Sequence, residues 1–447
     1  MRTYYLRSFG CQMNEHDAER IRHALEAEGL TAVPHPGDAD VLVYNTCTVR
    51  RSADERLAGH LSEAARLKRD DPRRIVLVTG CLPQAERHDL FRRYPFVDGA
   101  LGPQSLHNLS ALVQAAADRL AGDGAPSPRP AYFADGPALS GELPGRRARP
   151  FQAWVQIMSG CTNFCAYCIV PYVRGPERSR PAADILAEVR ALAVDGVREV
   201  TLLGQNVNAY GLDRRRLGQR DAVDFASLLR ALDARGGVDR LRFMTSHPKD
   251  LTDEVVAAVA ELPCACEHVH LPLQAGSDRI LAAMGRRYTA ETFLARVAAL
   301  RAAVPDVSVT TDLIAGFPGE TEADFAATMD VVRAARFDGA FTFVFSARDG
   351  TRAATMPAQV PVDVRRARVE RLVELTHQLS LDAHERWVGR TVGVLVEGPS
   401  RHGDTLRGRT RQNVTVNFAG TARPGAIVEV KIEDATSTTL RGTALPS

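Results

Sequence analysis

Three cysteines spaced CxxxCxxC, at Cys161, Cys165 and Cys168, are the residues whose types and spacing point most directly to chemistry. They follow the apolar run Trp154 to Met158, so a strand should lead into a loop that carries three thiolates. Three thiolates are one fewer than a structural zinc site or a saturated four-iron cluster requires. The spacing also differs from the paired CxxC of zinc ribbons. The pattern predicts a four-iron cluster with one iron open to another ligand; structural cysteines or a zinc knuckle are the alternative.

A second set of three cysteines, Cys11, Cys47 and Cys81, is spread over the first part of the chain. Each comes directly after an apolar run, about one βα unit beyond the one before. Because the carboxyl ends of parallel strands meet at one edge of a sheet, these thiolates should converge there. A single cysteine directly after a strand is usually a small buried apolar residue. Three cysteines, each at the carboxyl end of a strand, indicate a second cluster that again lacks one protein ligand.

The elements that would position the second set are strands alternating with helices. Strand-like runs at Tyr4 to Leu6, Val41 to Tyr44 and Ile75 to Val78 are separated by helical patterns that begin near Glu15 and Ser52. This alternation predicts an open, parallel α/β domain over residues 1–120. Residues 121–149 are rich in Gly and Pro and should form a linker.

Residues 150–380 should form a barrel. Six strand-like runs alternate with helical patterns, around Val155, at 200–203, 241–244, 268–271, 307–311 and 341–345. Six βα units predict a partial (β/α)6 barrel of the TIM type, whose active face lies at the carboxyl ends of the strands. The CxxxCxxC loop follows the first of these strands.

Residues 381–447 switch to short β runs after a helical connector, which predicts a small, OB-like β-barrel of the kind that binds oligonucleotides. Its basic residues make it a candidate RNA-binding domain, although a solvated barrel is the alternative. The candidates for RNA contact are Arg401, Arg407, Arg409 and Arg411.

Loops after other barrel strands carry glycines, amides and a carboxylate suited to holding a charged amino-acid group. The same residues are common in any βα turn, so each loop alone is a weak signal. The candidates are Gly204, Gln205 and Asn206 after the second run, Gln274 and Ser277 after the fourth, and Asp312 and Gly316 after the fifth, with Tyr167 as a residue that would stack on a purine or pack against the barrel. We interpret His247 as a capping or packed histidine and Cys264 and Cys266 as structural. Arg174, Arg178 and Arg180 indicate a surface charge cluster, with contact to a substrate phosphate as the alternative.

Composition is that of an ordinary globular chain, with 45% hydrophobic and 25% charged residues and a formal net charge of +2. Eight cysteines in 447 residues do not make a disulfide scaffold. No secretory signal core and no apolar run long enough to span a bilayer is apparent, so we expect a reducing cytoplasm and no membrane partner.

These motifs together resemble the methylthiotransferase family of radical S-adenosylmethionine (SAM) enzymes over essentially the whole chain. The matching motifs are Gly10-Cys11-Gln12-Met13-Asn14, Asn45-Thr46-Cys47, Gly80-Cys81, the CxxxCxxC loop, Leu203-Gly204-Gln205-Asn206 and Gly316-Phe317-Pro318-Gly319-Glu320. The resemblance implies two 4Fe-4S clusters: one on Cys161, Cys165 and Cys168 that reduces SAM, and an auxiliary one on Cys11, Cys47 and Cys81 that supplies sulfur. It also implies that the last domain is a TRAM domain.

Within the family, three motifs resemble the branch that modifies N6-isopentenyladenosine beside the anticodon of tRNA. They are Gln12-Met13-Asn14, the stretch Ile169 to Gly175 and the stretch Gly408 to Asn413. This resemblance implies transfer of a methylthio group to C2 of that base, tRNA with its anticodon stem-loop as partner, an electron donor such as a flavodoxin, and an iron–sulfur carrier; we expect a monomer. The alternatives are the same chemistry on threonylcarbamoyl-adenosine tRNA or a ribosomal protein, and a zinc-stabilised RNA-binding protein.

Overall fold

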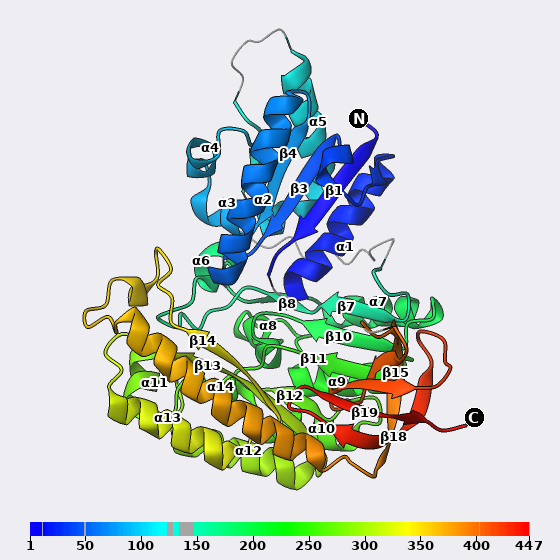
Figure 1. Cartoon of the computed structure of the whole chain (residues 1–447), viewed down its shortest axis with the longest axis vertical. Coiled ribbons are helices and arrows are strands. Elements are labelled where there is room, and N and C mark those ends of the chain that lie inside the picture. Colours follow the sequence, from blue (N-terminus) through cyan, green and yellow to red (C-terminus); the bar gives the residue numbers. More distant parts are fainter. Residues whose placement is uncertain (11, 49–50, 123–127, 134–146, 402, 447) are drawn as a thin grey trace. The chain divides into compact units, whose positions relative to one another are not determined.

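The computed structural model describes residues 1–10, 12–48, 51–122, 128–133, 147–401 and 403–446, with only the backbone of 51–55 (Figure 1). The chain forms two compact units. The first consists of Met1–Ala148, Ser159–Thr162 and Cys168–Arg178, and the second of Arg149–Met158, Asn163–Tyr167 and Ser179–Ser447. Cys161 and Cys168 therefore belong to the first unit and Cys165 to the second.

The first unit is built on the predicted parallel sheet, which has six strands. Their order is β2 (Thr31–Ala32), β1 (Thr3–Ser8), β3 (Val41–Thr46), β4 (Ile75–Gly80), β5 (Gly99–Leu101) and β6 (Ala131–Tyr132). Every residue of β3 and β4 is buried, because helices cover both faces of the sheet. This double burial explains why the two strands appear in the sequence as continuous apolar runs.

Two apolar cores fill the first unit, one on each face of the sheet (Figure 1). Helices α1 (Gln12–Ala27) and α5 (Leu109–Ala121) pack on one face through Ile21, Leu25 and Leu112. Helices α2 (Arg51–Asp70) and α4 (Asp89–Arg93) pack on the other through residues such as Leu61 and Leu90. Shorter elements complete the unit: η1 (Pro36–Asp38), α3 (Cys81–Glu86), η2 (Pro103–Asn108) and α6 (Val170–Arg174).

One part of the predicted linker is a strand. Ala131–Tyr132 forms β6, which pairs in parallel with Ala100 and Leu101 of β5 at the edge of the sheet. A two-residue strand leaves no periodicity in a Gly- and Pro-rich stretch, so the sequence could not indicate it. The rest of the linker at 123–127 and 134–146 lies outside the described residues.

The second unit contains the six predicted barrel strands as two three-stranded parallel sheets (Figure 1). One is β7 (Gln152–Gln156), β10 (Glu199–Leu203) and β11 (Arg240–Phe243); the other is β12 (His268–His270), β13 (Ser308–Ala315) and β14 (Gly339–Val344). Parallel bridging of Leu241 to Ala265 connects β11 to the segment that leads into β12. The flanking Cys264 and Cys266 are buried, and burial raises the pKa of both thiols, in agreement with a structural role.

Helices surround these strands as a (β/α)6 arrangement requires. They are α7 (Ala182–Val194), α9 (Phe225–Arg235), α10 (Asp253–Glu261), α11 (Asp278–Met284), α12 (Ala290–Ala303) and α13 (Glu322–Ala335). Short connections include β8 (Met158–Ser159), which pairs with β9 (Arg178–Ser179), as well as η3 (Val207–Ala209), α8 (Leu212–Arg216), η4 (Pro248–Asp250) and η5 (Arg352–Ala354). None of the helices in the described ranges is long and apolar enough to cross a membrane.

A closed five-stranded barrel ends the chain and belongs to the same unit as the six-stranded part. Helix α14 (Val362–Glu385) leads into it, and its strands are β15 (Thr391–Pro399), β16 (Leu406–Arg409), β17 (Thr415–Ala419), β18 (Ile427–Ala435) and β19 (Thr439–Ala444). The predicted barrel is confirmed, although the sequence indicated three of its strands. In β16, sequence LRGR, Leu406 is the one apolar side chain apart from a glycine, so no alternation was visible.

Candidate active site

The turns that carry the first set of cysteines lie at the carboxyl edge of the open sheet. Residues Thr46 and Gly80 are direct partners in the register of β3 and β4, so Cys47 and Cys81 follow neighbouring strand ends. Cys11 lies outside the described residues, but the preceding Gly10 does not. A methyl group on Gly10 would stand 2.3 Å from the Cβ of Cys47. The turn that leads to Cys11 thus approaches Cys47 as closely as a glycine allows.

Gly80 plays the corresponding part before Cys81. Its φ of +95° is open mainly to glycine, and a Cβ there would stand 2.3 Å from the carbonyl oxygen of Thr46. Cys47 and Cys81 are both buried, with 1% and 4% of their surface exposed. These observations fit a cluster held in a dry setting by closely approaching turns.

Neutral hydrogen bonds fix the same edge. The Asn14 side-chain amide donates to the carbonyl oxygen of Thr46 (2.9 Å), and that of Asn45 donates to the carbonyl oxygen of Asn14 (2.9 Å). The hydroxyl of Thr46 donates to the carbonyl oxygen of Thr79 (2.7 Å) and accepts the N–H of Leu82 (3.2 Å). The turns after β1, β3 and β4 are therefore tied together without any charged side chain.

The segment after Cys168 packs within the first unit. The guanidinium of Arg174 pairs with Asp17 of α1 at 3.1 Å, and both side chains are buried. Ile169 and Val173 form an apolar cluster with Cys81. The prediction that Arg174 belongs to a surface charge cluster is therefore wrong; the residue fastens α6 to the helix that follows Cys11.

The middle cysteine, Cys165, is held by the barrel. The N–H of Ala166 donates to the carbonyl oxygen of Met284 (2.8 Å), and the N–H of Ala353 donates to the carbonyl oxygen of Ala166 (2.8 Å). The guanidinium of Arg286 lies 3.6 Å from the Cys165 sulfur. No motif surrounds Arg286 in the sequence, so the sequence analysis missed it.

The loop after β10 holds two of the predicted SAM contacts in fixed positions. Gly204 lets Met158 approach, since a Cβ would stand 2.5 Å from its Cγ. The Asn206 amide donates to Asp250 (2.9 Å), while its Oδ1 is buried and has no hydrogen-bond partner among the described residues. An oxygen in that state fits an acceptor for an ammonium group. The structure does not test Gln205 or Tyr167, whose assignment to SAM stays a prediction.

The loop between β12 and α11 uses its predicted residues for structure. Gln274 is buried with φ of +72°, and it bridges to β13 through the carbonyl oxygen of Asp312 (2.8 Å) and the N–H of Ile314 (2.9 Å). Ser277 caps α11, and its hydroxyl donates to Asp324 (2.6 Å). Asp312 is partly exposed, and its carboxylate lies 3.4 Å from Nε2 of His270. Their assignment to SAM also stays a prediction.

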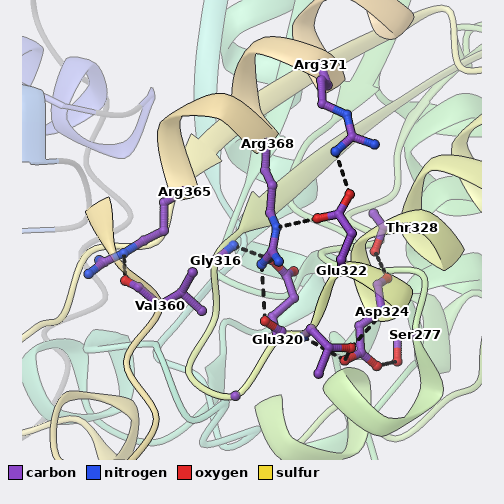
Figure 2. Close-up of polar contacts among 12 residues, drawn as sticks. Ser277, Gly316, Glu320, Glu322, Asp324, Thr328, Val360, Arg365, Arg368 and Arg371 are labelled. Atoms are coloured by element: carbon purple, nitrogen blue, oxygen red, sulfur yellow. Dashed lines mark hydrogen bonds and ion pairs between the residues drawn. The ribbon is translucent and has the colours of Figure 1, made fainter. Parts of the chain in front are cut away.

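The loop after β13 is fastened by arginines of α14 (Figure 2). The N–H of Gly316 donates to Glu320 (2.7 Å), and the buried Glu320 carboxylate pairs with Arg368 at 2.8 Å. The stem of Arg365 fills the space where a Cβ of Gly316 would stand, 2.0 Å from its Cγ. Next to this buried pair, Arg371 pairs with Glu322 at the surface (2.6 Å). Gly316 thus has a fixed backbone whose glycine makes room for Arg365, and its assignment to SAM stays a prediction.

His247 is a packed residue, as predicted. Its Nδ1 accepts the N–H of Lys249 (3.2 Å), and its ring lies edge-on to that of Tyr288. Burial, reinforced by the charges of Arg286, Lys249 and Arg287, lowers its pKa to about 2. A neutral imidazole at working pH agrees with a capping role.

Three of the four arginines proposed for RNA contact have protein partners. Arg409 and Arg407 pair with the buried Glu397 at 3.0 and 3.4 Å. Arg411 pairs at 2.8 Å with Glu267, which directly precedes β12 of the six-stranded part. Arg401 is exposed. RNA contact by these arginines stays a prediction, and for the three paired ones it requires sharing a carboxylate.

Two arginines that the sequence analysis missed connect the five-stranded barrel to the six-stranded part. Arg240 donates to the carbonyl oxygens of Arg409 (2.8 Å) and Gly393 (2.9 Å). Arg242 pairs with Glu199 at 2.8 Å and donates to the carbonyl oxygen of Thr410 (2.7 Å). Both lie on β11, where alternation indicated a strand but not what it would contact.

Comparisons with known proteins agree with this organisation. Residues 3–102 match Uncharacterized protein family UPF0004, residues 155–332 match the Radical SAM superfamily, and residues 385–445 match the TRAM domain. The radical SAM methyltransferase TsrM from Kitasatospora setae shares the fold, with a TM-score of 0.57 at 16% identity over 79% of this chain and 77% of that one.

Curated relatives cover almost the whole chain. The tRNA-2-methylthio-N(6)-dimethylallyladenosine synthase of Acidothermus cellulolyticus is 48% identical over 97% of this chain and 86% of its own length. The protein of the same name from Moorella thermoacetica is 45% identical over 99% of this chain and 98% of its own length. These matches, the cysteine-bearing strand ends and the domain order together place the chain in the methylthiotransferase family of radical SAM enzymes, as an enzyme of the tRNA methylthiotransferase class.

Proposed function

We propose that this enzyme transfers a methylthio group to C2 of N6-isopentenyladenosine next to the anticodon of tRNA and uses two four-iron clusters to do so. The observation that carries the proposal is that Cys47 and Cys81 follow neighbouring strand ends, with Cys11 as their third member in the sequence, while Cys161, Cys165 and Cys168 come after the first barrel strand. The names of the relatives supply the substrate.

The reaction explains why two sets are needed. C2 of a purine carries a hydrogen that no protein base can remove, so a radical has to abstract it. When bound, the CxxxCxxC cluster would supply the electron that cleaves SAM, the other cluster would supply the sulfur, and a second SAM would supply the methyl group. Each set provides three thiolates and thus leaves one iron for that task.

The protein's own residues orient and enclose the reactants. Gly10 and Gly80 allow the turns of the auxiliary set to close up, and the amides of Asn14 and Asn45 hold them there. On the barrel side, the buried Oδ1 of Asn206 would help to orient SAM. Holding the reactants in a fixed geometry lowers the activation barrier, because the entropy of bringing them together is lost on binding and not in the chemical step.

The remaining partners follow from this chemistry. The five-stranded barrel would grip the RNA backbone, with the exposed Arg401 as one of its cations, and the target base would be splayed out of the anticodon loop. An electron donor such as a flavodoxin would reduce the first cluster, and an iron–sulfur carrier would load both. We expect a monomer that works in the cytoplasm.

The nucleoside profile of tRNA from a deletion strain tests the substrate. Loss of 2-methylthio-isopentenyladenosine, restored by the wild-type gene but not by a Cys165→Ala gene, is the expected result. An unchanged nucleoside profile rejects the proposal, and loss of a methylthiolated threonylcarbamoyl-adenosine instead assigns the alternative tRNA substrate.

Iron and sulfide analysis of the anaerobically reconstituted protein tests the cofactors. Two clusters require about eight irons per chain. A protein that contains zinc and no sulfide would be a zinc-stabilised RNA-binding protein instead.

A further inference from the structure

Arg286 is a buried cation whose three donor nitrogens are all engaged. Nε donates to the hydroxyl of Tyr288 (2.8 Å), one terminal nitrogen donates to the carbonyl oxygen of Pro272 (3.0 Å), and the other donates to the sulfur of Cys165 (3.6 Å). The Tyr288 hydroxyl is itself fixed by the carbonyl oxygen of Leu273 (2.7 Å). The guanidinium therefore has one defined position, and that position is against the thiol.

No aspartate or glutamate in the described part of the chain forms an ion pair with Arg286. The arginine lines a cavity of about 720 Å³ together with Lys249, Arg287 and Arg296, of which Lys249 and Arg296 have acidic partners of their own, Asp250 and Asp253. The one carboxylate there, Asp278, accepts the N–H of Ala290 (2.7 Å). Burying a cation without an anion costs free energy. A negative charge beside Arg286, which its contacts in the protein do not supply, would therefore stabilise the site.

We infer that Arg286 is a positioning residue for the CxxxCxxC cluster. Arg286 holds Cys165 in place as a ligand and offsets the negative charge of the cluster. This inference rests on the proposed function, because it requires a cluster on Cys165. Three thiolates on a four-iron cluster make a net anion, and one-electron reduction adds another negative charge. A fixed cation beside one ligand sulfur favours the reduced form and therefore raises the reduction potential.

The test is a redox titration of this cluster followed by electron paramagnetic resonance. The full-length chain carries Cys47→Ala and Cys81→Ala, so that the CxxxCxxC cluster alone gives the signal. Arg286→Met should shift the reduction equilibrium at least tenfold toward the oxidised form, which is about 59 mV for one electron. Arg286→Lys keeps the charge and should shift it less. Arg287→Met is the control, because Arg287 lines the same cavity but is exposed and should leave the potential unchanged.

Each outcome decides the inference. Loss of iron from Arg286→Met with retention in Arg286→Lys supports it, because the charge is then needed to hold the cluster. An unchanged potential in an iron-loaded Arg286→Met protein overturns it, as does loss of iron from both variants. If the wild-type chain binds no iron and sulfide, the proposed function fails first. If wild-type enzyme makes product while the potential of Arg286→Met stays unchanged, only the role of Arg286 is wrong.

Discussion

The two regions that carry cysteines are held by different kinds of interaction. At the sheet edge of the first unit, glycines and neutral amides bring the turns together, and the hydrogen bonds of Asn14 and Asn45 contain no charge. In the second unit, arginines fasten the corresponding loops: Arg286 contacts Cys165, and Arg368 pairs with Glu320. The turns of the first region should therefore be sensitive to side-chain volume, although the buried Arg174–Asp17 pair fastens α6 beside them, and the second region should be sensitive to charge and pH.

The largest effect on iron content should come from adding one carbon at Gly10. A backbone conformation reserved for glycine costs another residue about 1–3 kcal/mol, and the new Cβ would also overlap Cys47. Gly10→Ala should reduce the iron content to that of Cys47→Ala while SAM cleavage continues. Gly29→Ala is the matched control, because Gly29 also has positive φ but nothing lies near its Cβ position. Full iron in Gly10→Ala would show that the edge is not set by volume.

The largest effect on stability should come from a charge change in the second unit. Arg368→Met leaves Glu320 buried without its cation, which typically costs about 3–5 kcal/mol. Urea unfolding followed by tryptophan fluorescence measures this unit alone, since Trp154 and Trp387 both belong to it. Arg371→Met, which breaks the exposed pair with Glu322, should cost no more than about 1 kcal/mol. Equal effects of the two substitutions would contradict the importance of the buried pair.

Acid should weaken the second unit through His247. Its folded pKa is about 2, and the unfolded value is about 6.5. Between these values the unfolded state binds one more proton, so the free energy of unfolding falls as pH drops below about 6.5, by up to about 1.4 kcal/mol per pH unit. His247→Asn should flatten this slope in the tryptophan signal. The exposed His377→Asn, in the same unit, should not, and an equal slope in wild type and His247→Asn would exclude the histidine as its cause.

The smallest effect should appear in RNA binding. Arg401→Ala should weaken tRNA binding a few-fold. The slope of the logarithm of the binding constant against the logarithm of the salt concentration should become shallower by about one. The stability of this variant should be unchanged, because Arg401 is exposed. Arg220→Ala, at another exposed position of the second unit, is the control in the same filter-binding assay. An Arg401→Ala protein with the wild-type salt slope would remove this residue from the interface.

The sequence predicted the strands that carry the cysteines because double burial makes β3 and β4 continuous apolar runs. It did not reveal Arg286, Arg368 or Arg242, because a buried arginine differs from a solvated one only through partners that are distant in sequence. For the same reason Arg174 was assigned to the surface, although Asp17 lies 157 residues away. Motifs locate turns and ligands, whereas charge partners become visible only in three dimensions.

The most direct test of two separate tasks is to compare Cys47→Ala with Cys165→Ala in the same assay mixture. Formation of 5′-deoxyadenosine measures SAM cleavage, and mass spectrometry of the tRNA nucleosides measures methylthiolation. We predict that Cys165→Ala abolishes both products, whereas Cys47→Ala continues to cleave SAM and forms no methylthiolated base. A Cys47→Ala enzyme that still makes the methylthiolated base would contradict the division between the two cysteine sets.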